Sequence, residues 1–375
     1  MSGGFFYLSE VIYMTELERA RLIIDEADRK IASLFEERMA AVKTVAEYKA
    51  AHGLPVFDAE REKAVIEKNV ERIENDSLKG FYSSLLTSFM DVSKKYQESL
   101  LCGMKVAFCG TQGAFAELAA KKIFPHGRPT AYSSFAASYE AVLNGDCECC
   151  VLPIENSYAG EVGQVIDLMF EGSLGVSGVY DMPIKQNLVA IKGAAKNEIK
   201  KVISHPQALM QCSEYIKEHG FESEQAANTA VAAKEIASLN DKTVAAIASA
   251  ETAELYGLEI IDHDINESAV NTTRFAVFSK YTGEISDKSE RFILLFTVND
   301  RVGALAKAVN VICAHGFNMR VLRSRPVKDV PWQYYFYVEA EGDSNSDESR
   351  KMLNELSVCC EKLKIAGHYS GQKII

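Results

Sequence analysis

The chain has 375 residues, of which 47% are hydrophobic and 25% are charged, and its formal net charge is −11. This composition is that of a globular protein with room for two or three domains, and the acidic balance disfavours nucleic acid and anionic membranes as partners. No apolar run reaches the roughly 20 residues of a membrane span, and the first residues lack the basic start and small-residue cleavage site of a secretory signal.

Nine cysteines are an odd number in a chain without a recognisable signal, which favours a reducing cytoplasm over a disulfide framework. Three of them, Cys147, Cys149 and Cys150, directly precede the apolar Val151 and Leu152. No second Cys or His pair follows at zinc-ligand spacing. The cluster therefore predicts a core strand of small residues rather than a metal site.

Helical periodicity begins after Met14, so we interpret residues 1–14 as an extension. Leu17, Ile24 and Ile31 recur every seven residues, which predicts an apolar seam on a long helix packed against others. Arg38 takes the next seam position. Lys49 follows 11 residues later and lies roughly 20° from the same face at ~100° per residue. Arg38 alone could be a salt-bridged surface cation, but two cations on one buried stripe favour a binding site.

A break follows this helix. Gly53-Leu54-Pro55 ends the helical pattern, and a second helix is predicted from about Asp58. Asp58, Arg61 and Glu62 are spaced i, i+3, i+4 and therefore share one face of it. Such a cluster is usually a solvated ion-pair network, so the spacing leaves its role open.

A third helix is predicted over about residues 78–101. Its apolar stripe contains Leu86 and Met90 but also the polar Ser93 and Gln97. Polar groups inside a buried stripe need hydrogen-bond partners. The stripe therefore marks Ser93 and Gln97 as candidates for a site inside the helical segment.

From residue 103 to about 282 the pattern alternates between strands and helices. Such alternation predicts an α/β domain with largely parallel sheets. The clearest strand-like runs are residues 104–109, 149–154, 188–191, 201–204 and 244–248.

Three polar strings in this region lie where an apolar run meets a turn: residues 151–157, 203–207 and 271–275. A glycine turn, Gly110–Gly113, follows the first strand in the same way. Open α/β folds place ligand-binding groups at such strand ends and at helix N-termini. Taken one at a time, two of the strings could equally be helix caps, including Ser204-His205-Pro206 with proline at the first helical position.

Residues 281–290 are a polar linker. The remaining chain predicts the order strand, helix, strand, strand, helix, strand, which is the ferredoxin-like βαββαβ arrangement. The predicted elements are residues 292–298, 303–314, 319–324, 334–340, 348–363 and 367–371.

The helical segment resembles the all-α chorismate mutase family through eight polar residues: Arg21, Arg38, Lys49, Asp58, Arg61, Glu62, Ser93 and Gln97. The resemblance implies that Arg38, together with Arg21 of a partner chain, binds the two carboxylates of chorismate, with Arg61 and Ser93 in support. Arg21 lies roughly 100° from the Arg38 face of the same helix, which suits a site shared between two chains.

The same resemblance assigns roles to the other four residues. Lys49 and Gln97 would donate hydrogen bonds to the ether oxygen as its C–O bond breaks, and Asp58 and Glu62 would bind the ring hydroxyl. A Claisen rearrangement needs no acid, base or nucleophile. It needs a held conformer and stabilised negative charge, which fixed cations provide.

The middle segment resembles the prephenate dehydratase family through its three strings and glycine turn. The family expels carbon dioxide and hydroxide from prephenate, and Thr273 matches its proton donor. Phe275 is expected to pack beneath the site. Backbone N–H groups of Gly110–Gly113 and after Pro206 would add anion-binding dipoles. The chain departs from the family at Thr111, where proline is common. The substrate and its carboxylates would be bound by Asn156, Ser157, Ser204, Gln207, Gln211 and Arg274.

The last segment resembles an ACT domain, an amino-acid-sensing module, through two loop motifs. The implied phenylalanine-binding residues are Gly303, Ala304, Leu305, Arg323, Ser324, Arg325 and Pro326. The second motif usually begins with glutamate, and this chain has Arg323. A reversed charge there could weaken feedback by repelling the ammonium group of the ligand, or could simply pair with a neighbouring acidic residue.

These resemblances imply a chain with a mutase domain over residues 15–102, a two-lobed α/β dehydratase domain over 103–282 and an ACT domain over 290–375. It would bind chorismate, prephenate and phenylalanine as a cytoplasmic homodimer or larger homo-oligomer, and neither reaction implies a cofactor. Two alternatives stay open. The second activity could be arogenate dehydration, or the chain could be a non-catalytic amino-acid sensor, against which Thr273 and the intact mutase set argue.

Overall fold

The computed structural model describes residues 15–52, 59–268, 270–280, 290–328, 330–371 and 373–375. Contacts among them define two compact units, one that ends at Met104 and one that begins at Lys105. Among the described helices, none has the length and apolar character needed to cross a bilayer.

The first unit is a set of three helices, α2 (Glu16–Ala51), α3 (Ala59–Val70) and α4 (Asp76–Cys102). A capping box starts α2, in which Thr15 Oγ1 accepts from Glu18 N at 3.2 Å and the Glu18 carboxylate accepts from Thr15 N at 2.7 Å. The predicted second and third helices are confirmed. Gly53, Pro55 and Asp58 lie outside the described residues.

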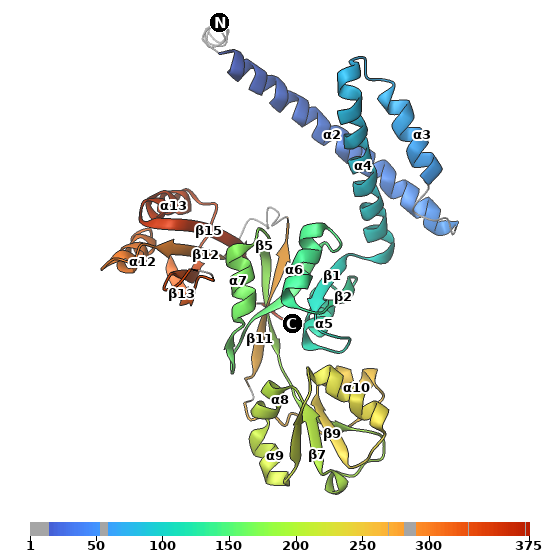
Figure 1. Ribbon diagram of the computed structural model, residues 1–375, viewed down its shortest axis with the longest axis vertical. Helices are drawn as coiled ribbons and strands as arrows, with labels where there is room; N and C mark the ends of the chain where they lie inside the picture. Colours follow the sequence, from blue (N-terminus) through green and yellow to red (C-terminus); the bar gives the residue numbers. More distant parts are fainter. Residues whose placement is uncertain (1–14, 53–58, 269, 281–289, 329, 372) are drawn as a thin grey trace, which may run out of the picture. The chain divides into compact units, whose positions relative to one another are not determined.

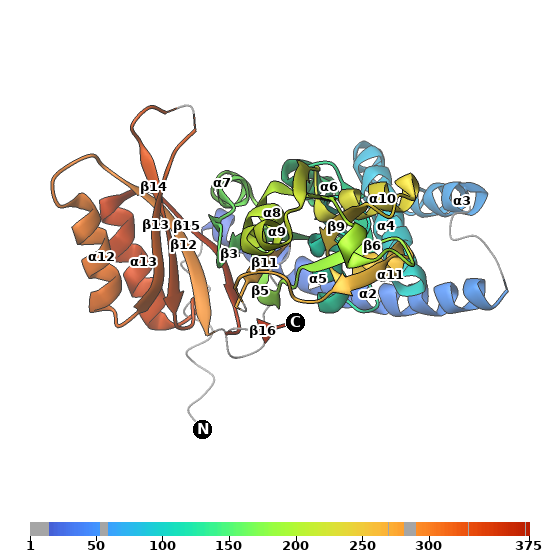
Figure 2. The ribbon, with the colours of Figure 1, turned by 90° about the horizontal axis from the view of Figure 1, so that it is seen from below.

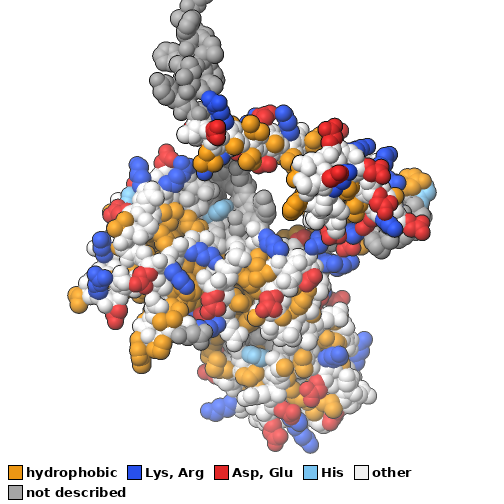
Figure 3. Space-filling model, turned by 45° about the horizontal axis from the view of Figure 1, so that its top comes forward, with side chains coloured by type: hydrophobic (Ala, Val, Ile, Leu, Met, Phe, Trp, Pro, Cys, Tyr) orange, Lys and Arg blue, Asp and Glu red, His pale blue; other side chains and the backbone are white. Residues whose placement is uncertain are grey.

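The predicted packing of the α2 seam is wrong within a single chain. Leu17, Ile24 and Ile31 are 61%, 57% and 50% exposed. Helix α4 packs on the second half of α2, where the rings of Phe35 and Phe89 lie 6.2 Å apart. Figure 1 shows the first half of α2 running past α4, and Figure 3 shows hydrophobic side chains exposed along it. The seam therefore lacks a partner among the described residues of this chain.

The second unit contains two lobes, each built on its own sheet. In the first lobe the strand order is β5-β11-β3-β1-β2, and in the second it is β10-β6-β9-β7-β8. The first-lobe strands are β1 (Lys105–Cys109), β2 (Arg128–Tyr132), β3 (Cys149–Asn156), β5 (Gly175–Pro183) and β11 (Thr272–Ser279), with the short β4 (Gly160–Glu161) beside β3. The second-lobe strands are β6 (Asn187–Ala190), β7 (Lys201–Ser204), β8 (Glu222–Gln225), β9 (Val244–Ala248) and β10 (Glu259–Asp262).

Helices cover both sheets, and each lobe has a separate apolar core. Those of the first lobe are α5 (Phe115–Ile123), α6 (Phe135–Asn144) and α7 (Gly163–Glu171). Those of the second lobe are α8 (Pro206–Gln211), α9 (Ser213–His219), α10 (Thr229–Leu239) and α11 (Ala250–Leu255), with a 3₁₀ turn at Lys196–Glu198. Cys147, Cys149 and Cys150 are buried, as predicted, and Cys147 and Cys150 belong to the first core. Burial raises the pKa of Cys149 to about 12.

The sheets are mixed, so the prediction of largely parallel sheets is wrong. Strand β1 is parallel to β2 and β3, but β11 is antiparallel to both β3 and β5. The chain leaves the first lobe after β5, builds the second lobe and returns as β11 (Figure 1). Because β11 enters from the end where β3 finishes, its first residues lie beside the last residues of β3.

The C-terminal part has the predicted βαββαβ order. Its antiparallel sheet has the strand order β13-β14-β12-β15. The elements are β12 (Arg291–Val298), α12 (Ala304–Ala314), β13 (Asn318–Pro326), β14 (Tyr334–Glu341), α13 (Asp347–Cys359), β15 (Cys360–Tyr369) and the short β16 (Lys373–Ile374).

This C-terminal sheet is buried on both faces. Phe292, Leu294 and Phe296 face α12 and α13, whereas Ile293 and Leu295 belong to the core of the first lobe. Figure 2 shows α12 and α13 on one side of the sheet and β3, β11 and α7 on the other. The unbroken apolar run of β12 is typical of a strand covered on both sides.

The predicted helix over residues 348–363 is wrong at its end, because α13 stops at Cys359. From Cys360 the backbone pairs with β12 instead, with Leu363 opposite Phe296. Further along, Gly367 pairs with Val176 of β5, and any Cβ on it would collide with the Val176 carbonyl. The C-terminal sheet is thus joined edge to edge with the first lobe.

Candidate active sites

A cavity of about 440 Å³ lies between the two lobes of the second unit. It is lined by the last residue of β3, by the start of β11 and by the start of α8, which are the positions singled out from the sequence. Its polar lining includes Asn156, Gln186, His205, Gln207, Gln211, Asn228, Thr229 and Thr273. Phe275, 2% exposed, also lines it, as expected for a ring packed beneath a site.

Two residues from different strings form the centre of this cavity. Thr273 of β11 is the cross-strand neighbour of Asn156 of β3. The Asn156 side-chain N–H donates to Thr273 Oγ1 at 2.9 Å, and Asn156 Oδ1 accepts from the backbone N–H groups of Tyr158 and Ala159 at 3.0 Å each. These bonds fix the amide orientation. The Thr273 oxygen is therefore an acceptor toward Asn156, which leaves its proton free for a ligand.

Further buried amides extend from this pair across the cavity. Asn156 also donates to Asn271 Oδ1 at 2.9 Å, and Asn271 donates to Gln211 Oε1 at 3.0 Å. Gln186, on the crossing between the lobes, approaches the same Gln211 oxygen at 3.5 Å. Gln186 Oε1 is buried and has no hydrogen-bond partner among the described residues. A buried acceptor without a partner among the described residues thus lies beside the cavity, in addition to the Thr273 donor.

His205 lines the cavity at the N-cap of α8. Its Nδ1 accepts from the backbone N–H of Gln207 at 3.2 Å, so a neutral ring carries its proton on Nε2. Burial lowers the pKa of His205 below its ordinary value. The imidazole is therefore neutral at neutral pH and acts as a hydrogen-bond donor rather than as a fixed cation.

The glycine turn also borders the cavity, at Gly110. The second lobe holds this turn in place, since Thr252 Oγ1 donates to Gly113 O at 2.7 Å. On the other side, Gly113 N donates to the buried Glu117 carboxylate at 2.5 Å. Thr111, the departure from the family pattern, is exposed and is not part of the cavity lining.

Three predicted substrate-binding residues are not part of the cavity lining. Ser204 is fully buried and donates to Ile247 O at 2.7 Å, so it ties β7 to β9. Ser157 Oγ accepts from Thr272 N at 2.9 Å and donates to Val270 O at 3.2 Å. Arg274 forms ion pairs on the opposite face of β11. In this structure the Ser204 and Ser157 hydroxyls bond backbone atoms, and Arg274 faces away from the cavity.

In the helical unit, Arg38 lies between α2 and α4. Its guanidinium hydrogen-bonds to Ser93 Oγ, approaches Met90 Sδ at 3.6 Å and lies over the Phe89 ring at 5.7 Å from the centroid. Partial burial lowers the pKa of Arg38, yet the group remains a cation at neutral pH. Arg38 is thus a half-buried cation whose position is fixed by Ser93 and the Phe89 ring, and such a group can bind an anion.

Gln97 lies one turn beyond Ser93 and is equally buried. Its Nε2 donates to Ser93 O at 3.3 Å, and its Oε1 has no hydrogen-bond partner among the described residues. On α3, Glu62 forms an ion pair with Lys94 of α4 at 3.1 Å. Glu62 is thus held toward α4.

The remaining mutase residues differ in exposure. Lys49 is half-buried near the end of α2, Arg61 is exposed on α3, and Arg21 is exposed on the unpaired half of α2. Asp58 lies outside the described residues. The structure therefore joins Arg38, Ser93 and Gln97 directly and leaves Arg21 apart from them.

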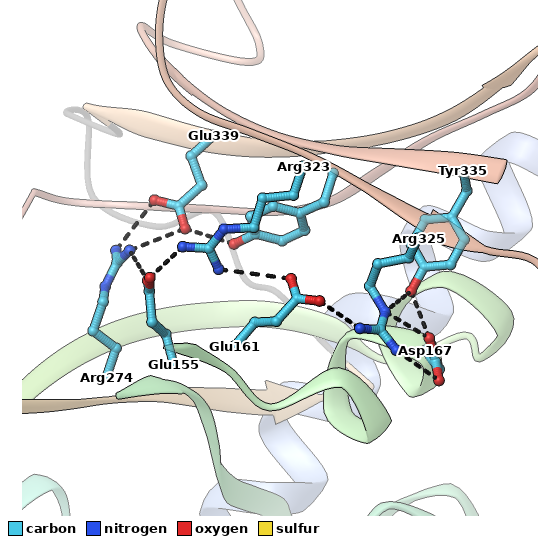
Figure 4. A network of polar contacts seen from close by, with 9 residues as sticks. Glu155, Glu161, Asp167, Arg274, Arg323, Arg325, Tyr335 and Glu339 are labelled. Atoms are coloured by element: carbon cyan, nitrogen blue, oxygen red, sulfur yellow. Dashed lines mark hydrogen bonds and ion pairs between the residues drawn. The ribbon is translucent and has the colours of Figure 1, made fainter. Parts of the chain in front are cut away.

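The predicted regulatory residues divide between two faces. Ala304 and Leu305 line a second cavity of about 460 Å³ beside Trp332, and Gly303 caps α12. On β13 the exposed Ser324 and Pro326 alternate with the partly buried Arg323 and Arg325. Figure 4 shows these two arginines pointing to the first lobe.

Gln186, Asn271 and Lys94 were not predicted as site residues from the sequence. Asn271 is the first residue of the string that supplies Thr273, so its polarity before a strand was a usable signal. Gln186 begins a polar break between two apolar strands, which is less specific. Lys94 is adjacent to Ser93 and could not be told from a solvated lysine.

Comparisons with known proteins agree with this geometry. The family model for prephenate dehydratase matches residues 106–282, and that for chorismate mutase type II matches residues 20–98. The bifunctional chorismate mutase/prephenate dehydratase of Aquifex aeolicus (strain VF5) is 32% identical over 95% of this chain and 98% of its own length. The protein of the same name from Enterobacter agglomerans is 29% identical over 94% of this chain and 95% of its own length.

Solved structures resemble the second unit. The prephenate dehydratase from Arthrobacter aurescens in complex with L-Phe has a TM-score of 0.66 and 25% identity, covering 71% of this chain and 90% of that one. GqqA, described as a novel type of quorum quenching acylase, has a TM-score of 0.66 and 31% identity, covering 71% and 98%. The Aquifex aeolicus relative is 32% identical over 95% of this chain, and the two family models match one unit each. The protein therefore belongs to the family of bifunctional chorismate mutase/prephenate dehydratases.

Proposed function

We propose that the chain converts chorismate to prephenate in its helical unit and prephenate to phenylpyruvate between the lobes of its second unit, two successive steps toward phenylalanine. The observation that carries the second assignment is the hydrogen bond from Asn156 to Thr273 inside a polar cavity. It presents a hydroxyl proton at the place where a leaving group would need one.

In the helical unit the chemistry is charge stabilisation. Arg38, held by Ser93, binds a carboxylate of chorismate, and its planar fork suits that geometry. Lys49 and Gln97 stabilise the ether oxygen as negative charge develops there. Gln97 is already buried and anchored, so little of its freedom is lost in the transition state.

Arg21 completes the site from a second copy of the chain. It lies on the half of α2 that α4 does not cover, beside the exposed seam of Leu17, Ile24 and Ile31. Large apolar side chains in a row mark an interaction surface. Pairing two such helices would bury the seam and bring each Arg21 to the other chain. The functional form is accordingly a homodimer or a larger homo-oligomer.

In the cavity, the C–C bond to the ring carboxylate breaks and carbon dioxide leaves. Its electron pair enters the ring as the C–O bond to the ring hydroxyl breaks. The departing hydroxide takes the Thr273 hydroxyl proton and leaves as water, and a proton from solvent restores the Thr273 hydroxyl. Threonine is a weak acid, so placement of its proton by Asn156 and the gain of aromaticity carry the step. No cofactor enters this scheme.

Binding of the substrate falls to the neutral polar groups of the lining. Gln207, Gln211 and the Nε2–H of His205 supply side-chain donors for carboxylates, and the glycine turn supplies backbone N–H groups. Within the part of the chain that the structure describes, Gln186 Oε1 is a buried acceptor without a partner, and the ring hydroxyl is the donor that prephenate can offer it.

Phenylalanine is the proposed effector, bound by the C-terminal part as a ferredoxin-like ACT domain. Ala304 and Leu305 border a cavity, and a relative has been crystallised with L-Phe. Arg323 pairs with Glu155 of β3. It therefore faces the first lobe and does not repel an ammonium group, which favours retained feedback over its loss.

Arogenate is the alternative substrate, because its extra ammonium group could also pair with Gln186 Oε1. An acylase activity like that named for GqqA is less favoured. Acyl transfer needs an activated nucleophile, and burial raises the pKa of the cavity thiol, Cys109, so it stays protonated.

The test is an assay of the purified protein with chorismate, prephenate and arogenate supplied separately. The proposal predicts consumption of chorismate, and conversion of prephenate to phenylpyruvate faster than of arogenate to phenylalanine. A folded protein that leaves both chorismate and prephenate unchanged would overturn it.

A further inference from the structure

Neighbouring residues on β11 and β3 point to opposite faces of the first-lobe sheet, since side chains alternate along a strand. Thr273 pairs with Asn156 on the cavity face. The next pair, Arg274 opposite Glu155, lies on the face that meets the C-terminal sheet. Thr273 and Arg274 are joined by one peptide unit, as are Asn156 and Glu155. A shift of the Arg274–Glu155 pair therefore also shifts the Thr273–Asn156 pair.

Arg274 is surrounded by carboxylates from three strands. Its guanidinium meets both Glu339 carboxylate oxygens at 3.1 Å, Glu155 at 3.4 Å and Asp181 of β5 at 3.3 Å. Glu339 is on β14 of the C-terminal sheet and is 2% exposed. A bidentate pair fixes direction as well as distance, so Glu339 sets the orientation of Arg274 (Figure 4).

Glu339 is itself held rigidly by its own sheet. Tyr337 OH donates to it at 2.6 Å and Tyr369 OH at 2.8 Å. Burial alone would raise the pKa of Glu339, but the Arg274 charge and the two hydroxyls outweigh that effect and lower it. The carboxylate is therefore ionised and immobile at neutral pH, a fixed anchor for Arg274.

A second arginine holds the other member of the pair. Arg323 of β13 forms an ion pair with Glu155 and lies 3.9 Å from Glu161. Both residues next to the Asn156–Thr273 pair are thus attached to the C-terminal sheet (Figure 4).

We propose that Arg274 and Glu339 are positioning residues for the dehydration, because their bidentate pair fixes β11 so that Thr273 keeps its hydrogen bond with Asn156. Neither residue lines the cavity. The inference rests on the proposed dehydratase function and adds residues that act on it from the far side of the sheet.

The same interface provides a matched control. Arg325 of β13 forms ion pairs with Asp167 of α7 at 3.0 Å and also with Glu161. Gly163 leaves room for this guanidinium, since any Cβ there would collide with it. Asp167 is 6% exposed and accepts from Tyr335 OH at 2.7 Å. Like Glu339 it is a buried carboxylate bonded to an arginine and a tyrosine of this interface, but it lies on a helix that lines no part of the cavity.

The experiment compares Glu339→Gln with Asp167→Asn, each of which removes one buried negative charge from this interface. For Glu339→Gln we expect a kcat for prephenate about tenfold to a hundredfold lower, with KM changed by less than about threefold. Asp167→Asn should keep kcat. Both variants should lower the unfolding temperature, and by a similar amount. Arg274→Lys, which keeps the charge but loses the fork, should be intermediate. In a Thr273→Ala background, Glu339→Gln should have no further effect.

An unchanged kcat in Glu339→Gln, or equal losses of kcat in both variants, would overturn the proposal. The two carboxylates would then serve only to attach the C-terminal sheet to the first lobe. Amide hydrogen exchange over residues 272–275 separates this outcome from failure of the proposed function, because it needs no substrate. Faster exchange in Glu339→Gln but not in Asp167→Asn would support positioning even if the native chain left prephenate unchanged. Equal exchange in both variants would refute it.

Discussion

Replacing Thr273 with valine removes the hydroxyl proton from the cavity while keeping a β-branched side chain of similar shape. Asn156 loses its 2.9 Å bond to Thr273 Oγ1 but retains Asn271 Oδ1 at 2.9 Å and Thr272 O at 3.3 Å. The amide is not orphaned, so the loss of folding stability should be about 1 kcal/mol. The effect on turnover should be far larger than the effect on stability.

A positioned proton donor contributes about 10²–10⁴ in rate, or about 3–5 kcal/mol of barrier. Thr273→Val and Thr273→Ala should lose that factor in kcat for prephenate, with KM little changed because Gln207, Gln211 and His205 remain. Thr273→Ser keeps the hydroxyl and should retain part of the activity. Phenylpyruvate formation at saturating prephenate, against a reaction without enzyme, measures all three. Near-native turnover in Thr273→Val would refute the acid role and transfer it to another donor, such as a bound water.

Three further outcomes are expected. Arg38→Ala and Lys49→Ala should each lose about 10²–10⁴ in mutase rate while dehydration of supplied prephenate is largely retained. A simultaneous loss of both activities in folded protein would contradict separate sites. Mixing inactive Arg21→Ala chains with inactive Arg38→Ala chains should restore one mutase site per heterodimer, and no recovery after verified subunit exchange would rule out a shared site. Calorimetry should show that the native chain binds phenylalanine and that Arg323→Glu does not bind it more tightly, because Arg323 pairs with Glu155. Tighter binding by the variant would mean that Arg323 faces the ligand.

The sequence identified the strings that meet at the cavity, because polar residues after apolar strands tend to gather at one sheet edge. It could not tell which members of a string face the cavity. Thr273 and Arg274 are adjacent and equally polar, and only the pairing of β11 with β3 separates their faces. Ser204 illustrates a related limit, since a hydroxyl at a strand end can bond the neighbouring backbone, as it does here, as easily as a ligand.

The helical unit shows a different limit. Heptad spacing predicted that Leu17, Ile24 and Ile31 are buried, and a single chain leaves them exposed. A seven-residue repeat gives the face that packs and does not say whether its partner belongs to the same chain. The α13 boundary failed for the opposite reason, because pairing of Leu363 with β12 overrode a helical pattern that continued past Cys359.

The most direct test of the account is the time course of the purified native chain with chorismate alone, compared with the Lys49→Ala and Thr273→Val variants. We predict that the native chain forms phenylpyruvate from chorismate through prephenate. Thr273→Val should stop at prephenate, and Lys49→Ala should leave chorismate largely unconverted while still processing added prephenate. If phenylpyruvate formed from chorismate at the native rate in either variant, the assignment of two sequential sites to these residues would be wrong.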